Sequence, residues 1–273
     1  MRALISGTGM YIPPITVDND ALSRVMDTSD EWIRVRTGIA ERHYASPDQA
    51  SSDLGVPAAR MAIEDAGLQL ADIDYLIFAT MTPDYFFPGS APFLQRKLGL
   101  EQIPCLDIRQ QCAGFIYALQ LADALVRSGQ HRRILLIGAE THASLIPWDD
   151  STWQVVLGEA NGPLPPEELE RNTSTRDRVV LFGDGAGAVV VEPSERDDRG
   201  ILDSLIHTNG NEAERLWTNA GGSAFRPYFH PSMYESGDVT PIGEGRKVYA
   251  LAVTFMPEVT QQILERNGYT LDD

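Results

Sequence analysis

Residues 103–128 read IPCLDIRQQCAGFIYALQLADALVRS, a short apolar run followed by a longer amphipathic one. The run at 103–108 predicts a buried strand, and the residues from 113 to 128 predict a helix that ends at Gly129. Cys112 then lies at a strand-to-helix turn, against the positive end of the helix dipole. This position lowers the pKa of a thiol and supplies a nucleophilic thiolate. A buried structural role is the alternative for an isolated cysteine, and the flanking residues favour the nucleophile.

The alternation of apolar runs and amphipathic segments continues on both sides of this stretch. Apolar runs predict strands at 3–8, 75–80 and 133–139, and helices are predicted at 18–26, 51–66 and 92–98. Strands that alternate with helices predict an α/β fold with right-handed crossovers and a largely parallel sheet. The continuous apolar character of 75–80 indicates a sheet that is covered on both faces.

The pattern changes after Trp148. Residues 151–178 are polar, contain proline and lack sheet periodicity, so we predict an inserted surface loop with one helical turn at 166–171. Further along, strands are predicted at 179–182 and 186–191 around a glycine turn, another strand at 201–207, and a long helix at 246–267. Because no apolar run follows this helix, the second α/β unit is predicted to be incomplete.

The composition narrows the functional class. The chain has 273 residues and a formal net charge of −17, which argues against a nucleic-acid partner. Any acidic partner would also be repelled unless it met a local basic patch. The two cysteines, Cys105 and Cys112, form no disulfide framework and indicate a reducing compartment. Without a signal-peptide core or an apolar run of membrane length, we expect a cytoplasmic protein with no membrane partner.

Other kinds of site receive less support from the sequence. Gly7 and Gly9 follow a strand, but the rest of a dinucleotide-binding fingerprint is missing. The glycines within 183–187 could hold a phosphate, although strand signals on both sides favour a hairpin. No metal site is predicted, because the five histidines are scattered. A cysteine hydrolase with His142 or His207 as its base remains open, although a structural histidine is commoner at such positions.

Six stretches, in order along the chain, resemble those of β-ketoacyl-[acyl carrier protein] synthase III, a family of the thiolase superfamily. They are TSDEWIRVRTGIAERH at 28–43, FATMTPDYFFPGSA at 78–91, DIRQQCAGFIYALQLADAL at 107–125, LLIGAETH at 135–142, LFGDGAGAVV at 181–190 and GRKVYALAVTFMPEV at 245–259. The resemblance implies a thiolase-like, five-layered αβαβα fold of two similar halves, the second incomplete here. The halves would be 1–150 and 179–273, separated by the inserted loop at 151–178, in a homodimer.

By the same resemblance, the chain would be an acyltransferase that begins fatty acid or related biosynthesis. Cys112 would accept an acyl group from acyl-CoA. A malonyl thioester on acyl carrier protein would then decarboxylate and attack the acyl-enzyme. A covalent intermediate divides one difficult condensation into two easier steps. No resident cofactor is implied, because the CoA thioester is itself a substrate.

The resemblance also assigns roles to five further residues. Trp32 would stack on the adenine of CoA, and Thr28 and Arg36 would hold the nucleotide end. Phe87 would cross the dimer interface and close the acyl pocket, and Tyr249 would line the pantetheine tunnel. Simple helix packing is the alternative for Trp32, and an ordinary core position is the alternative for Phe87.

Two features depart from the family pattern. The family completes its catalytic triad with a histidine and an asparagine beyond the helix that ends at Gly268, so we expect a truncated synthase. The segment 151–178 is longer than is usual, and it lies near an arginine contact to CoA for which Arg171 is one candidate. The rival functions are a starter-unit, ester- or amide-forming relative in secondary metabolism, and a non-catalytic acyl- or CoA-binding fragment.

Overall fold

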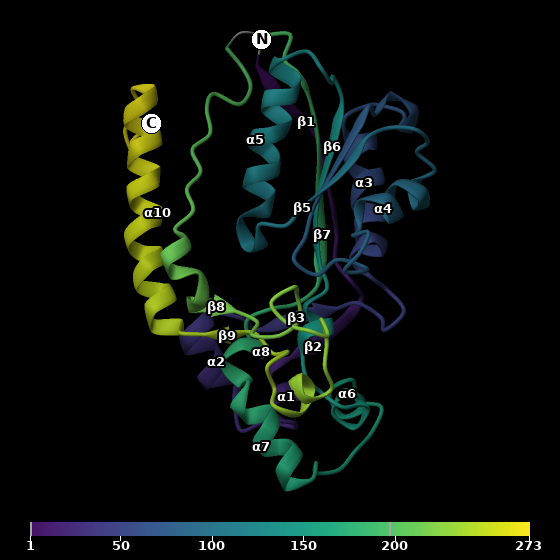
Figure 1. The fold of residues 1–273 in the computed structure, drawn as a ribbon, viewed down its shortest axis with the longest axis vertical. Helices are drawn as coiled ribbons and strands as arrows, with labels where there is room; N and C mark the ends of the chain where they lie inside the picture. The colour runs from purple at the N-terminus through teal and green to yellow at the C-terminus, as the bar shows by residue number, and fades with distance from the viewer. Residues whose placement is uncertain (1, 197) are drawn as a thin grey trace. The chain divides into compact units, whose positions relative to one another are not determined.

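A five-stranded mixed sheet forms the centre of the first of the two units into which the chain divides, residues 1–201 and 202–273. The computed structural model describes residues 2–196 and 198–273. Across the sheet the strands follow the order β1-β7-β6-β4-β5 (Figure 1). Their bounds are β1 Ala3–Tyr11, β4 Tyr75–Ala79, β5 Cys105–Ile108, β6 Ile134–Glu140 and β7 Gly185–Pro193. The strands predicted before residue 140 are therefore confirmed.

The prediction of a largely parallel sheet is wrong. β4 pairs parallel with β5 and β6, whereas β7 pairs antiparallel with β1 and β6. The register places Glu140, the last residue of β6, opposite Gly185, the first residue of β7. The connection of residues 141–184 thus leaves the end of β6 and returns to the neighbouring position at the same end of the strands. β7 therefore runs antiparallel to β6.

Helices cover both faces of this sheet. α3 (Ser51–Asp65) and α4 (Ala91–Leu98) lie on one face, and α5 (Gly114–Arg127) lies on the other (Figure 1). Burial on both faces explains why β4 and β6 are continuously apolar rather than alternating. Fully buried residues on the two faces include Leu54, Phe78, Leu94, Ala118, Ala122 and Val126. Short 3₁₀ helices in this unit are η1 Leu70–Asp72, η2 Gln111–Ala113 and η3 His142–Leu145.

Gly7 and Gly9 bring β1 into close contact with α3. A Cβ atom on Gly7 would lie 2.2 Å from the carbonyl oxygen of Ala62, and one on Gly9 would lie 2.1 Å from that of Ala58. Both distances are far inside van der Waals contact, so these positions accommodate only a hydrogen atom. The two glycines therefore have a packing role, which accounts for the motif without a bound dinucleotide.

A second core lies at one end of the first unit, around the antiparallel pair of strands β2 (Ile15–Asp18) and β3 (Glu41–Tyr44) (Figure 1). The helices that surround it are α1 Asn19–Ser23, α2 Asp30–Thr37, α6 Asp150–Val156, α7 Pro166–Ser174 and α8 Arg176–Val179. Tyr44, Trp148 and Val156 are buried in this core.

Residues 151–178 are therefore not the surface loop that their polarity predicted. Three helices span most of this segment, and Thr152, Glu168 and Asn172 are buried. Glu168 accepts hydrogen bonds from the hydroxyl groups of Ser151 and Thr152. The sequence pattern failed here because polar residues that find internal partners can be buried without producing an apolar stripe.

Two of the strands predicted after residue 178 do not form. Residues 179–182 end α8 and enter a turn, so no hairpin forms with β7, and 201–207 has no regular secondary structure. β7 instead completes the first sheet through its pairing with β1 and β6. The first unit extends to residue 201. The division into two similar halves stays a prediction.

The second unit contains the long helix α10 (Gly245–Asn267), which confirms the helix predicted at 246–267. Gly268 ends it with a left-handed φ of 73°. The other elements are η4 Gly210–Arg215, β8 Leu216–Trp217, α9 Ser232–Glu235 and β9 Ile242–Gly243, and β8 pairs with β9. Within the described residues, no helix combines the length and the apolar character needed to cross a membrane.

Candidate active site

Cys112 lies between a strand and a helix, as predicted. η2 follows β5 and leads directly into α5, so Ala113 alone separates the cysteine from the first helical residue. The Cys112 side chain is exposed. Because the first N–H groups of a helix lack partners within it, the start of α5 presents a positive potential that stabilises negative charge on the sulfur.

The residue before the cysteine is strained. Gln111 has a φ of 44°, in the left-handed region. A residue other than glycine pays on the order of 1–2 kcal/mol to adopt this conformation, and such positions cluster at functional sites. The strained turn presents Cys112 on the surface rather than in the core.

A cavity of about 230 Å³ opens beside Cys112. Its walls come from the ends of β4 and β6, the start of β7 and the beginning of α5. The lining residues are Ala79, Gln111, Cys112, Phe115, Gly138, Ala139, Glu140, Gly185, Ala186 and Gly187. Three of them are glycines, and Glu140 supplies the only carboxylate in this lining. The cavity is therefore suited to a small, mainly apolar group next to the sulfur.

Glu140 is fixed by the turn that follows β4. Its carboxylate accepts hydrogen bonds from the N–H groups of Met81 (2.8 Å) and Thr82 (3.1 Å). It also accepts hydrogen bonds from the hydroxyl groups of Thr80 (3.2 Å) and Thr82 (2.5 Å). Glu140 is not among the site residues predicted from the sequence. Its signal was an acidic side chain at the carboxyl end of a buried strand, where the chain enters the candidate site.

Cys105 contrasts with Cys112. It is half-buried at the start of β5, and its Sγ lies 3.8 Å from Oε1 of Gln95. Burial, followed by the negative charge of Asp107, raises the pKa of the Cys105 thiol. Both effects disfavour a thiolate at this position. Cys112 is therefore the better placed nucleophile.

A second group of candidate residues surrounds Trp32 in the first turn of α2. The hydroxyl of Ser29 caps this helix by accepting the Trp32 N–H at 3.1 Å. Two guanidinium groups lie over the half-buried indole ring, that of Arg36 at 4.3 Å from the ring centroid and that of Arg176 at 4.6 Å. The hydroxyl oxygen of Thr28 is buried with no hydrogen-bond partner among the described residues. The guanidinium groups thus place hydrogen-bond donors close to the aromatic ring of Trp32.

Arg176, which was not predicted from the sequence, lies over Trp32, whereas Arg171, the predicted candidate, does not. Arg171, on α7, pairs with Asp149 at 2.6 Å, whereas Arg176 begins α8 and reaches Trp32. The two arginines are close in a segment without clear periodicity, so the turn between the two helices decides which one faces the indole. The Arg-Asp-Arg triplet ahead of the apolar residues at 179–182 was the available signal.

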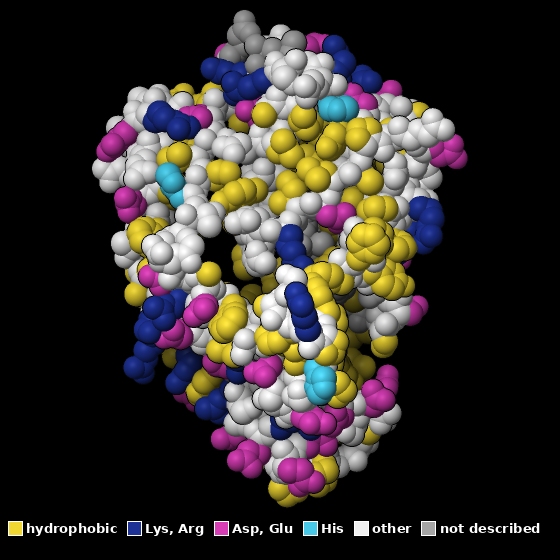
Figure 2. Space-filling view, in the orientation of Figure 1, with side chains coloured by type: hydrophobic (Ala, Val, Ile, Leu, Met, Phe, Trp, Pro, Cys, Tyr) yellow, Lys and Arg dark blue, Asp and Glu magenta, His cyan; other side chains and the backbone are white. Residues whose placement is uncertain are grey.

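Cationic side chains concentrate near Trp32 despite the net charge of −17. Arg34 and Arg36 come from α2, and Arg176 and Arg178 come from α8. Figure 2 shows Asp and Glu side chains gathered over the region of α7 at the lower end of the view. Three of these arginines lie close to carboxylates: Arg34 to Asp30, Arg176 to Asp27 and Arg178 to Asp177. The positive charge of this cluster is therefore largely neutralised.

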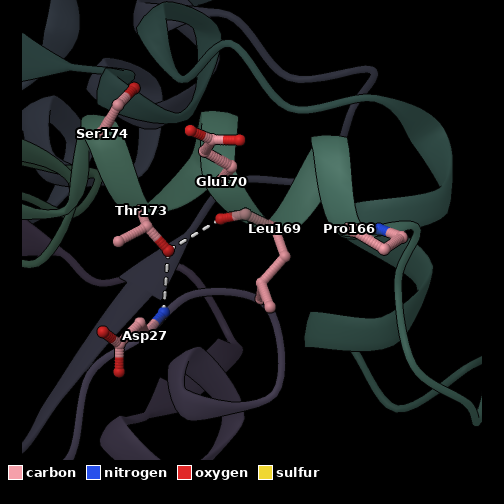
Figure 3. Close-up of a pocket in the computed structure, with 6 residues that line it drawn as sticks. All are labelled: Asp27, Pro166, Leu169, Glu170, Thr173 and Ser174. Atoms are coloured by element: carbon pink, nitrogen blue, oxygen red, sulfur yellow. Dashed lines mark hydrogen bonds between the residues drawn. The ribbon is translucent and has the colours of Figure 1, made fainter.

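An open groove of about 470 Å³ lies between α7 and the segment that precedes α2. Its lining residues are Asp27, Pro166, Leu169, Glu170, Thr173 and Ser174 (Figure 3). The carboxylates of Asp27 and Glu170 would repel a phosphate in this groove. An anionic ligand would bind more favourably beside the guanidinium groups at Trp32.

Two other predicted site residues, Phe87 and Tyr249, do not line the Cys112 cavity. Tyr249 belongs to the second unit. Phe87 is 88% exposed, next to the exposed Tyr85 and Phe86, and it is not among the residues that line the cavity. It is therefore not the core aromatic that was its alternative. Tyr249, on α10, is 70% exposed.

His142 is poorly suited to act as a base for Cys112. Burial lowers its pKa, and its ring stacks on Phe182 with centroids 4.5 Å apart. It is not among the residues that line the Cys112 cavity. The other candidate base, His207, belongs to the second unit.

Sequence comparisons identify relatives of the whole chain. A family model for 3-oxoacyl-[acyl-carrier-protein (ACP)] synthase III matches residues 106–164 and 167–210. The beta-ketoacyl-[acyl-carrier-protein] synthase III of Rickettsia bellii is 39% identical over 273 residues, which is 100% of this chain and 75% of the relative. This match does not support the expectation of a truncated synthase.

Solved structures give the same family and confirm the predicted thiolase-like α/β fold. The 3-oxoacyl-[acyl-carrier-protein] synthase III of Aquifex aeolicus has a TM-score of 0.78 and 33% identity, covering 98% of this chain and 73% of its own. The priming β-ketosynthase of the R1128 polyketide pathway also has a TM-score of 0.78, with 29% identity over 99% of this chain and 72% of its own. Together with the identity to the Rickettsia protein over the whole chain, these likenesses show that the chain belongs to the β-ketoacyl-[acyl-carrier-protein] synthase III family.

Proposed function

We propose that this chain accepts an acyl group from acyl-CoA on Cys112 and condenses it with a malonyl thioester on acyl carrier protein, with loss of carbon dioxide. The observation that carries the proposal is the exposed Cys112, which a strained turn holds at the start of α5 beside a small cavity. The names of the relatives agree with a condensing acyltransferase that begins fatty acid biosynthesis.

In the first half-reaction, the Cys112 thiolate attacks the carbonyl carbon of the acyl-CoA thioester. A bond forms between the Cys112 sulfur and that carbon, the bond from carbon to the CoA sulfur breaks, and CoA leaves as its thiolate. The positive end of α5 favours the charged sulfur before the attack. The cavity beside Cys112 then receives the acyl group.

In the second half-reaction, the malonyl thioester loses its carboxylate as carbon dioxide. The electron pair left on the α-carbon attacks the carbonyl of the acyl-Cys112 thioester. A carbon–carbon bond forms, the bond from carbon to sulfur breaks, and Cys112 is restored as a thiolate. Negative charge develops on the thioester oxygen during decarboxylation, and by the family resemblance the histidine and asparagine of the triad would donate the hydrogen bonds that accelerate this step.

The group around Trp32 is the proposed site for the nucleotide end of CoA. The indole ring is the proposed stacking partner of adenine, and the guanidinium groups of Arg36 and Arg176, which lie over the ring in this structure, would move to the phosphates when CoA binds. The buried hydroxyl of Thr28 has an unused hydrogen bond to offer. We retain Tyr249 as the proposed wall of the pantetheine tunnel.

An acyl carrier protein is the proposed second partner, in agreement with the names of the relatives. An acidic carrier would be repelled by the net charge of −17, and the arginines of α2 and α8 offset this only in part, because three of them are paired with carboxylates. Its prosthetic arm ends in the same pantetheine group as CoA, so one entrance would serve both substrates.

A second copy of this chain is the proposed partner of the aromatic loop. Tyr85, Phe86 and Phe87 are 61%, 54% and 88% exposed. Adjacent exposed aromatic side chains of this size are typical of interfaces. In a homodimer, Phe87 would close the acyl pocket of the other subunit.

The reaction uses no resident cofactor, because the CoA thioester carries the activated acyl group. We also propose a cytoplasmic location. Both cysteines are free thiols, and a reducing compartment keeps them in that state.

Acylation of Cys112 tests the first half-reaction directly. The protein is incubated with acetyl-CoA, and the modified peptide is located by mass spectrometry. We expect one acetyl group on Cys112, none after Cys112→Ser, and an unchanged amount after Cys105→Ser. An acetyl group on Cys105 with Cys112 unmodified would refute the assignment of the nucleophile.

A starter-unit enzyme of polyketide biosynthesis is the second candidate function. The likeness to the R1128 priming β-ketosynthase favours it, because the TM-score equals that of the Aquifex synthase. Competition among acyl-CoA donors for Cys112 separates the two. Preference for acetyl-CoA supports the fatty acid role, whereas preference for a longer or branched primer supports the polyketide role.

A further inference from the structure

Hydrogen bonds from α7 hold the segment that leads into α2. The Nδ2 of Asn172 donates a hydrogen bond to the backbone carbonyl of Val25 at 3.1 Å. The hydroxyl of Thr173 accepts one from the N–H of Asp27 at 2.9 Å (Figure 3). Two consecutive residues of α7 therefore form hydrogen bonds with the backbone of Val25 and Asp27 in the segment 24–29, which ends at the N-cap of α2.

Neighbouring helices hold the same segment. Arg176 of α8 donates to the backbone carbonyl of Asp27, and its guanidinium lies 3.8 Å from the Asp27 carboxylate. Arg24 donates to the carbonyl of Val156 at the end of α6, at 3.3 Å. The helices within 150–179 thus determine the path of the chain immediately before Thr28.

The Thr173 hydroxyl is oriented for its bond to the segment. It donates to the carbonyl of Leu169 at 2.7 Å, so its oxygen lone pairs remain to accept the Asp27 N–H (Figure 3). Asn172 is only 1% exposed, and its Nδ2 also donates to the Thr152 hydroxyl at 3.1 Å. Both side chains act on the backbone of the segment through bonds with defined geometry.

We infer that Asn172 and Thr173 are positioning residues for the nucleotide site, and that α7 sets where Thr28 and Trp32 lie. This inference rests on the proposed binding of CoA at Trp32. Without the Thr173 hydroxyl, the Asp27 N–H loses its acceptor and the start of α2 loosens. Contacts to the nucleotide then weaken, while the reactivity of Cys112 is unaffected.

Thr173→Val tests the inference, because it removes the hydroxyl with little change in shape. The KM for acetylation of Cys112 by acetyl-CoA should rise about 3- to 10-fold with kcat unchanged, as for one lost hydrogen bond. Acetylation by acetyl-N-acetylcysteamine, a thioester without a nucleotide, should keep its rate. Thr173→Ser retains the hydroxyl and should restore the KM.

Thr260→Val is the matched control. Thr260 makes the same hydrogen bond within a helix, to the carbonyl of Met256 at 2.8 Å, but lies on α10. Both thioesters should acetylate this variant at wild-type rates. Circular dichroism of each variant verifies folding. Thr173→Ala, which removes the same hydroxyl without adding a methyl group, gives a second measure if Thr173→Val does not fold.

A double-mutant cycle separates positioning from general stability. If Thr173 acts through the Trp32 site, Thr173→Val should not raise the KM further in a Trp32→Ala background. Additive effects, an unchanged KM, or an equal loss with both thioesters would overturn the inference. A wild-type protein that uses both thioesters equally well would instead refute the nucleotide site, and the inference with it.

Discussion

Replacement of Glu140 by Gln should destabilise the first unit and distort the wall of the Cys112 cavity. The Glu140 carboxylate accepts four hydrogen bonds from residues 80–82. Gln has nearly the same shape, but one of its terminal atoms is an NH₂ group that donates. If the NH₂ takes the place of Oε1, the N–H of Met81 is orphaned. If it takes the place of Oε2, the N–H of Thr82 keeps only its second acceptor, the hydroxyl of Thr80 at 3.1 Å.

The magnitude follows from these contacts. One orphaned N–H costs about 1–3 kcal/mol, and the remaining bonds lose the contribution of an ionised acceptor. The two Thr hydroxyls can rotate, which recovers part of the loss. Because the orientation with the NH₂ in place of Oε2 leaves each backbone N–H with an acceptor, we expect a destabilisation of about 1–2 kcal/mol, or a decrease in melting temperature of about 2–8 °C for a unit of this size.

Urea unfolding followed by circular dichroism measures this change. The rate of acetylation of Cys112 by acetyl-CoA, measured in parallel, reports on the cavity. Glu64→Gln is the matched control, because Glu64 is exposed on α3, and it should change the stability by less than about 0.5 kcal/mol. A Glu140→Gln protein as stable as this control would refute the reasoning.

Three further predictions concern packing, ligand binding and pH. Gly9→Ala should destabilise the protein by about 3 kcal/mol or more, because its Cβ would overlap the carbonyl oxygen of Ala58; a thermal melt within 2 °C of wild type, about 1 kcal/mol, would contradict this. Arg176→Ala should weaken CoA binding about 10-fold by loss of its charge beside Trp32, and an unchanged Kd in calorimetry would remove Arg176 from the site. Burial lowers the pKa of His142 below its ordinary value of 6.5 in the folded state. The unfolded chain therefore binds a proton more readily, and stability should fall as the pH drops below about 6.5. His142→Leu should reduce this loss between pH 7 and pH 5, as measured by urea unfolding at each pH.

Local patterns predicted the position of Cys112 between a strand and a helix, and most of the central sheet. The strand at 103–108, the helix after Cys112 and the apolar runs at 75–80 and 133–139 depend on residues within a few positions of one another. The choice between strand and helix is governed by hydrophobic periodicity and by the residues that end each element. These features could therefore be predicted without knowledge of tertiary contacts.

Tertiary structure alone decided three other features. The direction of β7 depends on the connection of residues 141–184, which leaves the end of β6 and returns beside it at the same end of the strands. The helices within 150–179 bury Glu168 and Asn172, whose partners lie on other elements. The approach of Arg176 rather than Arg171 to Trp32 depends on how α8 packs against α2. Sequence periodicity records which face of an element is apolar, but a polar side chain whose partner lies on another element is buried or exposed according to how the elements pack.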